Sequence, residues 1–204
     1  MIVAPDLVAH DGRPVLVWRF DAPRLVIASA SVGGGIGERR WVLNAQVPKD
    51  YARHDLDDHV ASIAAAHGCS GAGVGMLTAA SLDAPGLADD GGVTCSATVG
   101  VTKPTWAADA DDAISAWAPG TINVVAQLPV TVSADALVNA VVTATEAKTQ
   151  ALLERGVPGT GTASDAVCIV CPVDGPTERF AGPRSVWGAR LARATHAAIV
   201  KGLP

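Results

Sequence analysis

Residues 133–171 read SADALVNAVVTATEAKTQALLERGVPGTGTASDAVCIVC and contain a long helical pattern, a glycine-rich loop and an apolar run. Ser133 is a favourable N-cap residue, and Gly156 followed by Pro158 is typical of a helix C-terminus. Apolar residues recur at helical spacing between these ends, so we predict a helix over 134–155. The apolar run at 164–171 predicts a strand directly after the loop.

The rest of the chain adds more strands and two further main helices. Helices are predicted over 55–67, with acidic residues in the first turn, and over 184–201, with a short one at 109–118. Two predicted strands, 15–20 and 24–32, flank a turn at Asp21-Ala22-Pro23, and two more, 72–80 and 92–101, flank a polar turn. Further strands are predicted over 41–47 and 121–128, with a short one at 177–181. Clustered strands with three main helices favour an α+β fold, a single layered domain over 1–204 whose mixed or antiparallel sheet is covered by those helices.

Composition limits the classes of function. The chain has 204 residues, 49% of them hydrophobic, which is enough to bury a core and excludes global disorder. The net charge of −5 and the lack of a basic run argue against nucleic acid as a partner. The sequence shows no secretory signal and no apolar run approaching ~20 residues, so we expect no membrane partner. Four cysteines are too few for a disulfide scaffold, so we expect a reducing, cytoplasmic location. Assembly into a homo-oligomer is left open.

Cysteines and histidines do not suggest a metal centre. Cys168 and Cys171 are three residues apart in a predicted strand, so their side chains should face opposite sides of the sheet. We therefore interpret them as buried structural thiols. The five histidines lack the spacing of a zinc motif. We expect neither a metal nor a cofactor.

Lys148 interrupts the apolar face of the helix at 134–155. At 100° per residue a polar stripe runs along Asn139, Thr143, Glu146, Gln150 and Glu154, and Lys148 lies on the opposite side. A lone buried ammonium is costly. Lys148 either extends to solvent from the helix end or pairs with an acid such as Asp165 beneath the sheet. Glu146, on the other helix face, is either solvated or a second functional group.

Two loops and three amides are candidate binding elements. The loop at 159–165 offers the hydroxyls of Thr160, Thr162 and Ser164 around Gly161, either as a ligand cradle or as a tight turn with local hydrogen bonds. The glycine cluster at 33–37 is interpreted as a flexible hairpin loop, because a predicted strand follows it instead of a helix.

The amides of Asn44, Gln46 and Asn123 stand in or beside apolar strands. By strand alternation, Asn44 and Gln46 point to one face. Because buried amides need partners, they either bind a substrate amide or form a core network.

Several short stretches together resemble the adenosylcobinamide amidohydrolase family (CbiZ). They occur in the family's order over roughly residues 26–200, and their joint order is more specific than any one of them. They are Gly33-Gly34-Gly35, Val42-Leu43-Asn44 with Gln46-Val47, Leu77-Thr78-Ala79-Ala80, Gly120-Thr121-Ile122-Asn123, Thr145-Glu146-Ala147-Lys148, Thr160-Gly161-Thr162 through Asp165, Ala181-Gly182 and Trp187-Gly188.

The resemblance implies hydrolysis of the amide that joins aminopropanol to a propionate arm of a corrin ring, giving adenosylcobyric acid in corrinoid salvage. It also implies a small-molecule corrinoid substrate, whose cobalt belongs to the substrate. As a hypothesis for this reaction, we assign catalysis to Lys148, Asp165, Glu146 and Thr162, and substrate binding to Gly34, Gly35, Asn44, Gln46, Thr78, Asn123, Thr160, Gly161 and Ser164. The chain departs from the family pattern at Thr102-Lys103-Pro104, where the family usually has Ser-Asn-Ala.

Two mechanisms and two other functions are compatible with these residues. Water could attack the amide with Asp165 or Glu146 as base, while Lys148 and the backbone near Gly161 stabilise the oxyanion. Alternatively a hydroxyl of Thr160, Thr162 or Ser164 could attack through an acyl-enzyme. The alternative functions are a corrinoid carrier or sensor without catalysis, and an amidohydrolase for another small amide.

Overall fold

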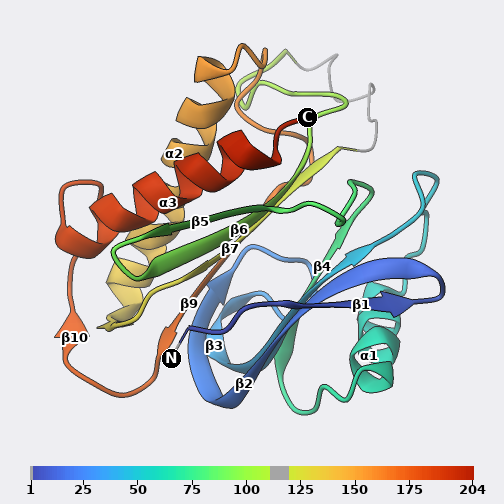
Figure 1. Ribbon diagram of the computed structural model, residues 1–204, viewed down its shortest axis with the longest axis horizontal. Coiled ribbons are helices and arrows are strands. Elements are labelled where there is room, and N and C mark those ends of the chain that lie inside the picture. Colours follow the sequence, from blue (N-terminus) through green and yellow to red (C-terminus); the bar gives the residue numbers. More distant parts are fainter. Residues whose placement is uncertain (1, 111–119) are drawn as a thin grey trace.

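The computed structural model describes residues 2–110 and 120–204, so the predicted helix at 109–118 lies outside the described residues apart from its first two positions (Figure 1). The described helices are α1 (Leu56–Ala66), α2 (Ala134–Glu154) and α3 (Val186–Gly202). The strands are β1 (Asp6–His10), β2 (Arg13–Ala28), β3 (Gly35–Gln46), β4 (Gly73–Thr78), β5 (Gly86–Asp90), β6 (Val93–Gly100), β7 (Thr121–Gln127), β8 (Thr131–Val132), β9 (Ala166–Pro172) and β10 (Thr177–Glu178).

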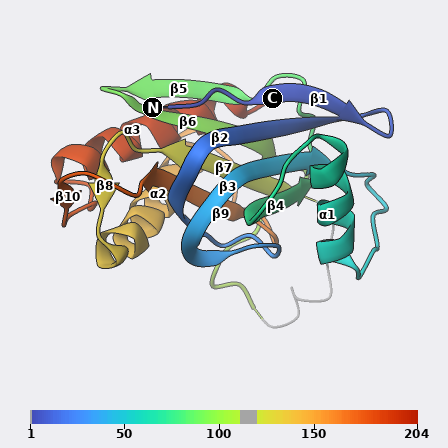
Figure 2. The same ribbon diagram turned by 90° about the horizontal axis from the view of Figure 1, so that it is seen from below.

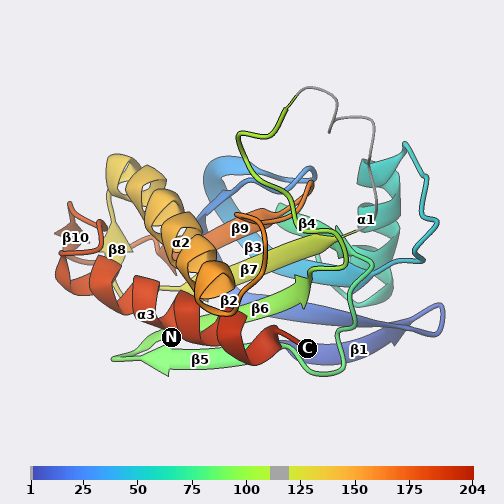
Figure 3. The ribbon, with the colours of Figure 1, turned by 90° about the horizontal axis from the view of Figure 1, so that it is seen from above.

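Eight strands form one mixed sheet, which confirms the predicted α+β class. The order is β4-β3-β2-β9-β7-β6-β5, with β1 paired to β2. The pairs β3–β4 and β7–β9 are parallel and the other pairs in this sheet are antiparallel. Helices α2 and α3 cover the part of the sheet formed by β5, β6, β7 and β9. Helix α1 packs near β3 and β4 at the other end (Figures 1 and 3).

The sheet folds over on itself and thereby creates three layers of core. The first lies between β5–β9 and the helices α2 and α3, and includes Ile122 and Leu152. The second lies between the two parts of the sheet, where Trp18 and Val42 meet Val125. The third lies between β2, β3 and α1. One face of β7 and β9 therefore packs against α2 and α3, and the opposite face packs against the other part of the sheet.

The predicted turn at 21–23 is wrong, because β2 is one long strand. Its pairing with β3 shifts between Arg19 and Arg24, so the residues in between form a bulge that bends the strand without reversing it. Figure 2 shows the resulting curvature of β2 and β3. Pro23 has no N–H to donate to the ladder and is compatible with such a bulge.

The predicted turn between 72–80 and 92–101 is also wrong. The strands that form there, β4 and β6, pair with different partners, β4 with β3 and β6 with β5 and β7. The connection between them contains β5. Strand β1 was not predicted, and the strand expected at 177–181 is the two-residue β10, which pairs with β8.

The long helix forms as predicted, with two differences. Ser133 occupies the N-cap position of α2 but its side chain makes no capping hydrogen bond. Thr143, placed in the polar stripe, is buried and donates to the carbonyl of Ala181 at 2.8 Å. At the other end Gly156 takes a φ of +73°, the left-handed conformation that its position after the helix requires. Within the described residues, no helix has the length and apolar character needed to cross a membrane.

Candidate active site

The ends of several strands meet at one edge of the sheet, next to the loop at 159–165. Because β7 and β9 are parallel, with Asn123 opposite Ala166, both begin at this edge. Antiparallel β6 ends there, with Gly100 opposite Thr121. The C-terminal end of β2 also lies there, since the N–H and the hydroxyl of Ser29 bond to the backbone of Val167 at 3.0 Å each.

Lys148 is buried and forms an ion pair with Asp165 at this edge. The side chain of Lys148 is 8% exposed and that of Asp165 is 11% exposed. Lys148 comes from the buried face of α2, and Asp165 is the last residue before β9. The prediction that the lysine pairs with this acid is therefore confirmed, and the alternative that it extends to solvent is wrong.

Asp165 also accepts hydrogen bonds from the chain around it. Its Oδ1 accepts from the backbone N–H of Ile122 at 2.9 Å and contacts the hydroxyl of Thr162 at 2.5 Å. Its Oδ2 accepts from the ammonium of Lys148 and from the backbone N–H of Thr162 at 3.1 Å. An ionised carboxylate has about four acceptor positions, so these four donors occupy them all.

Gly161 is required by its closeness to the ion pair. A Cβ atom at this position would lie 2.6 Å from the Nζ atom of Lys148 and even closer to Oδ2 of Asp165. A side chain would therefore push the two groups apart. This is a specific reason for glycine at this position of the loop.

The segment after β6 lies against the same loop. Thr105 and Gly161 form an isolated β-bridge, with the N–H of Thr105 donating to the carbonyl of Gly161 at 2.9 Å. The N–H of Thr160 donates to the carbonyl of Thr105 at 2.9 Å. The part of the chain that departs from the family pattern, at Lys103-Pro104, thus precedes a segment that is packed on the site.

The three hydroxyls of the loop have different surroundings. Thr160 accepts from the N–H of Ala107 at 3.0 Å, and Ser164 pairs with the hydroxyl of Thr121 at 2.8 Å. Thr162 contacts both Asp165 and the carbonyl of Gly120, the latter at 2.8 Å. Of these three, Thr162 is the hydroxyl with a hydrogen bond to a carboxylate. The loop is thus partly the hydrogen-bonded turn that the sequence left open.

The amides of Asn44 and Asn123 form a buried network between the two parts of the sheet. Asn123 donates to the side-chain oxygen of Asn44 at 2.8 Å, and Asn44 donates to the hydroxyl of Thr98 at 3.0 Å. Asn123 also reaches the carbonyl of Leu77 at 3.3 Å. This favours the core-network alternative. Asn123 directly follows Ile122, whose N–H binds Asp165, so the two networks are neighbours along β7.

Close packing at Gly100 and Gly120 places the end of β4 next to the loop at 159–165. Thr78 is buried and its hydroxyl accepts from the N–H of Ala80 at 3.0 Å. The Cβ of Ala80 would lie 2.9 Å from a Cβ at Gly100, and Gly120 is in turn close to the methyl group of Thr162. The family-like stretches at Thr78, Gly120 and Thr162 are thus packed together.

Other candidate residues lie elsewhere. Glu146 is exposed and lines a shallow groove on the outer side of α2. Gln46 lines a cavity with His10 and Tyr51, near α1. Gly34 lies in the β2–β3 turn, where its carbonyl accepts from Arg39 at 3.2 Å, and Gly35 is the first residue of β3, paired with Ala28, so the predicted loop at 33–37 is shorter than expected.

The thiols are buried as expected. Cys168 packs in the core between the sheet parts and Cys171 packs under α2 and α3, on opposite faces of β9. Burial raises the pKa of the Cys168 thiol to about 12. Among the described residues, no group of three or more His, Cys, Asp or Glu side chains could hold a metal ion.

Two groups at the site were missed by sequence reasoning. The backbone N–H of Ile122 carries no signal in the sequence, because every residue except proline has one. Thr98 is the partner of Asn44, and strand alternation on β6 could have placed its hydroxyl on the inner face, but not opposite a residue 54 positions away.

Comparisons with known proteins identify the family of this chain. The family model described as adenosylcobinamide amidohydrolase (CbiZ) matches residues 4–204. An adenosylcobinamide amidohydrolase of Methanosarcina mazei is 30% identical over 185 residues, which is 86% of this chain and 88% of that relative. One of Halobacterium salinarum is 31% identical over 204 residues, covering 95% of this chain and 85% of that relative. Since the match extends along almost the whole sequence, the chain belongs to the adenosylcobinamide amidohydrolase family.

Proposed function

We propose that this protein is an amidohydrolase that cleaves the aminopropanol amide of adenosylcobinamide and releases adenosylcobyric acid in corrinoid salvage. Membership of the family supports the reaction and the substrate class. The observation that supports the place of catalysis is the buried pair of Lys148 and Asp165, in contact with Thr162. Amide hydrolysis needs a nucleophile, a proton acceptor and a stabilised oxyanion, and these three side chains offer one of each.

Lys148 is the proposed donor to the oxyanion. Among the described residues, its ammonium makes one hydrogen bond, to Asp165, and an ammonium has three N–H groups. Two N–H groups are thus left for the substrate carbonyl. Burial strengthens such an interaction, because the effective dielectric constant is lower than in water. By contrast, the backbone N–H groups of Thr160 and Thr162 already have partners.

Thr162 is the proposed nucleophile. Its oxygen forms a bond to the amide carbon while its proton passes to Asp165, and the proton then goes to the amine nitrogen as the carbon–nitrogen bond breaks. The free amine is released and an ester on Thr162 is left. Water hydrolyses this ester, which gives the carboxylic acid and restores the hydroxyl. The occupied acceptor positions of Asp165 support this route over direct attack by water, because no lone pair is left to bind that water.

The test is incubation of the purified protein with adenosylcobinamide, followed by mass spectrometry of the products. We expect the purified protein to release adenosylcobyric acid and aminopropanol in equal amounts. We also expect the same activity in the cytoplasmic fraction of the source cells. The proposed chemistry uses protein side chains alone, so a chelator should leave the rate unchanged. Tight binding of the corrinoid without release of aminopropanol would instead identify a carrier or sensor.

A further inference from the structure

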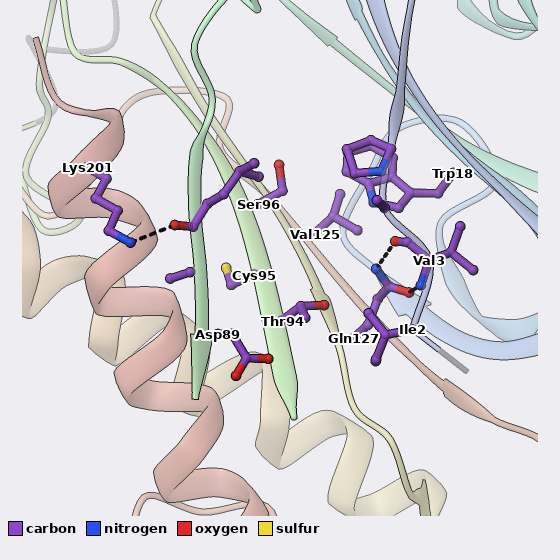
Figure 4. A pocket seen from close by; sticks show the side chains of 14 residues that line it. Ile2, Val3, Trp18, Asp89, Thr94, Cys95, Ser96, Val125, Gln127 and Lys201 are labelled. Atoms are coloured by element: carbon purple, nitrogen blue, oxygen red, sulfur yellow. Dashed lines mark hydrogen bonds between the residues drawn. The ribbon is translucent and has the colours of Figure 1, made fainter. Parts of the chain in front are cut away.

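A cavity lies between the N-terminal segment at residues 2–5 and the strands β5 and β6, away from the loop at 159–165 (Figure 4). Its volume is about 380 Å³, at the small end of the range of ligand pockets. Most of the lining is apolar and includes Ile2, Val3, Trp18, Leu87 and Val125. None of the residues assigned to hydrolysis is part of it.

The cavity has two facing walls. One wall carries Ser96 on β6, and the other carries Val3 of the N-terminal segment and Trp18 of β2 (Figure 4). The second wall is held in place by the buried amide of Gln127, which accepts from the N–H of Val3 at 3.0 Å and donates to its carbonyl at 2.7 Å. A space between two apolar walls suits a flat ring.

Two hydroxyls line the cavity without a partner. Ser96 is only 6% exposed and makes no hydrogen bond with any residue in the described parts of the chain. The Oγ1 atom of Thr94, two residues earlier on the same strand face, is buried and also has no partner within those parts. A buried hydroxyl without a partner is destabilising, so a polar atom of a ligand would satisfy an unmet hydrogen bond here.

The charges around the cavity favour an uncharged ligand. Its charged lining residues are Asp89 and Lys201, and both are exposed. The ammonium of Lys201 already donates to the carbonyl of Leu87 at 2.9 Å. A ligand charge placed between the apolar walls would lose its hydration without a buried counter-charge.

We propose that this cavity is a second ligand site, which binds an uncharged aromatic or heteroaromatic small molecule whose polar atom bonds to Ser96. This goes beyond the proposed hydrolysis and does not depend on it. Ring atoms would contact Val125 and Leu87, and the hydroxyl of Ser96 would orient the ring.

Titration of the full-length protein with indole tests the site, with indole-3-carboxylate as the charged probe. We expect saturable binding of indole in calorimetry, with backbone amide shifts in residues 2–4 and 87–96, and at least tenfold weaker binding of the carboxylate. S96A should weaken binding about fivefold, since it removes one hydrogen bond of about 1 kcal/mol. L87W should block the entrance, because Leu87 is 51% exposed at the cavity.

L153W is the matched control, because Leu153 is 48% exposed on the outer side of α2. It should bind indole like the wild type. The proposal is overturned if indole does not bind, if L87W binds it as well as L153W does, if the carboxylate binds equally, or if the amide shifts centre on residues 159–165.

Discussion

The pairing of Lys148 with Asp165 has a consequence for stability at the level of single residues. Removing one partner of a buried pair leaves the other charge without compensation. We expect K148M to lower the free energy of unfolding by about 3 kcal/mol. The double variant K148M/D165N should regain part of the loss, because neither remaining group is charged. Urea unfolding of both measures this.

The exposed Lys49 provides the control for this comparison. K49M should unfold within ~0.5 kcal/mol of the wild type, as surface changes usually do. If K148M were as stable as K49M, the buried pair would not exist in solution.

Thr162 carries a second prediction for a single residue. T162V keeps the side-chain shape but removes the hydroxyl, so acyl transfer should fall at least 10²-fold, while T162S should keep measurable turnover. The measurement is the rate of aminopropanol release, with mass spectrometry of the quenched wild type to detect an ester. Near-normal turnover by T162V, with no ester in a single turnover, would point to direct attack by water.

At the level of elements, the loop at 159–165 lies directly against the pair of Lys148 and Asp165, and Gly161 leaves the space that these two side chains occupy. In G161A the added methyl group would displace Lys148 or Asp165, since the position lies 2.6 Å from the Nζ atom. We expect loss of turnover of at least 10²-fold, with binding of the corrinoid affected less. The control is A163S, an exposed position of the same loop, which should turn over normally. Equal rates for the two variants would rule out close packing of Gly161 on the pair.

The elements also show what sequence can and cannot predict. Helix α2 and the position of Lys148 on its apolar side follow from local periodicity, which depends on neighbours within two turns. That Lys148 is buried against Asp165 became clear only from the structure. The bulge in β2 and the separation of β4 from β6 depend on which distant strands pair, and local patterns do not specify this. Thr98 was missed as the partner of Asn44 for the same reason, because the sheet must fold over before the two residues meet.

For the whole molecule, acid should weaken the fold through surface pairs. The guanidinium of Arg53 lowers the pKa of Asp55 to about 2, and Arg193 lowers the pKa of Asp90, joining β5 to α3. In the unfolded chain both carboxyls have pKa values of about 3.9. Their folded pKa is lower, so their stabilisation is present above about pH 5 and is lost as the pH falls toward 2.

We therefore expect the free energy of unfolding to decrease from pH 5 to pH 2, and to decrease less steeply in D90N. Urea unfolding at several pH values measures both slopes. The same slope in D90N and wild type would show that the pair of Asp90 with Arg193 does not contribute in solution.

The most direct test of the account compares the wild type with K148M/D165N in single-turnover conversion of adenosylcobinamide. Both proteins should bind the corrinoid, but the double variant should release aminopropanol at least 10³-fold more slowly while its circular dichroism spectrum is unchanged. Wild-type rates in a folded double variant would contradict the assignment of hydrolysis to this pair.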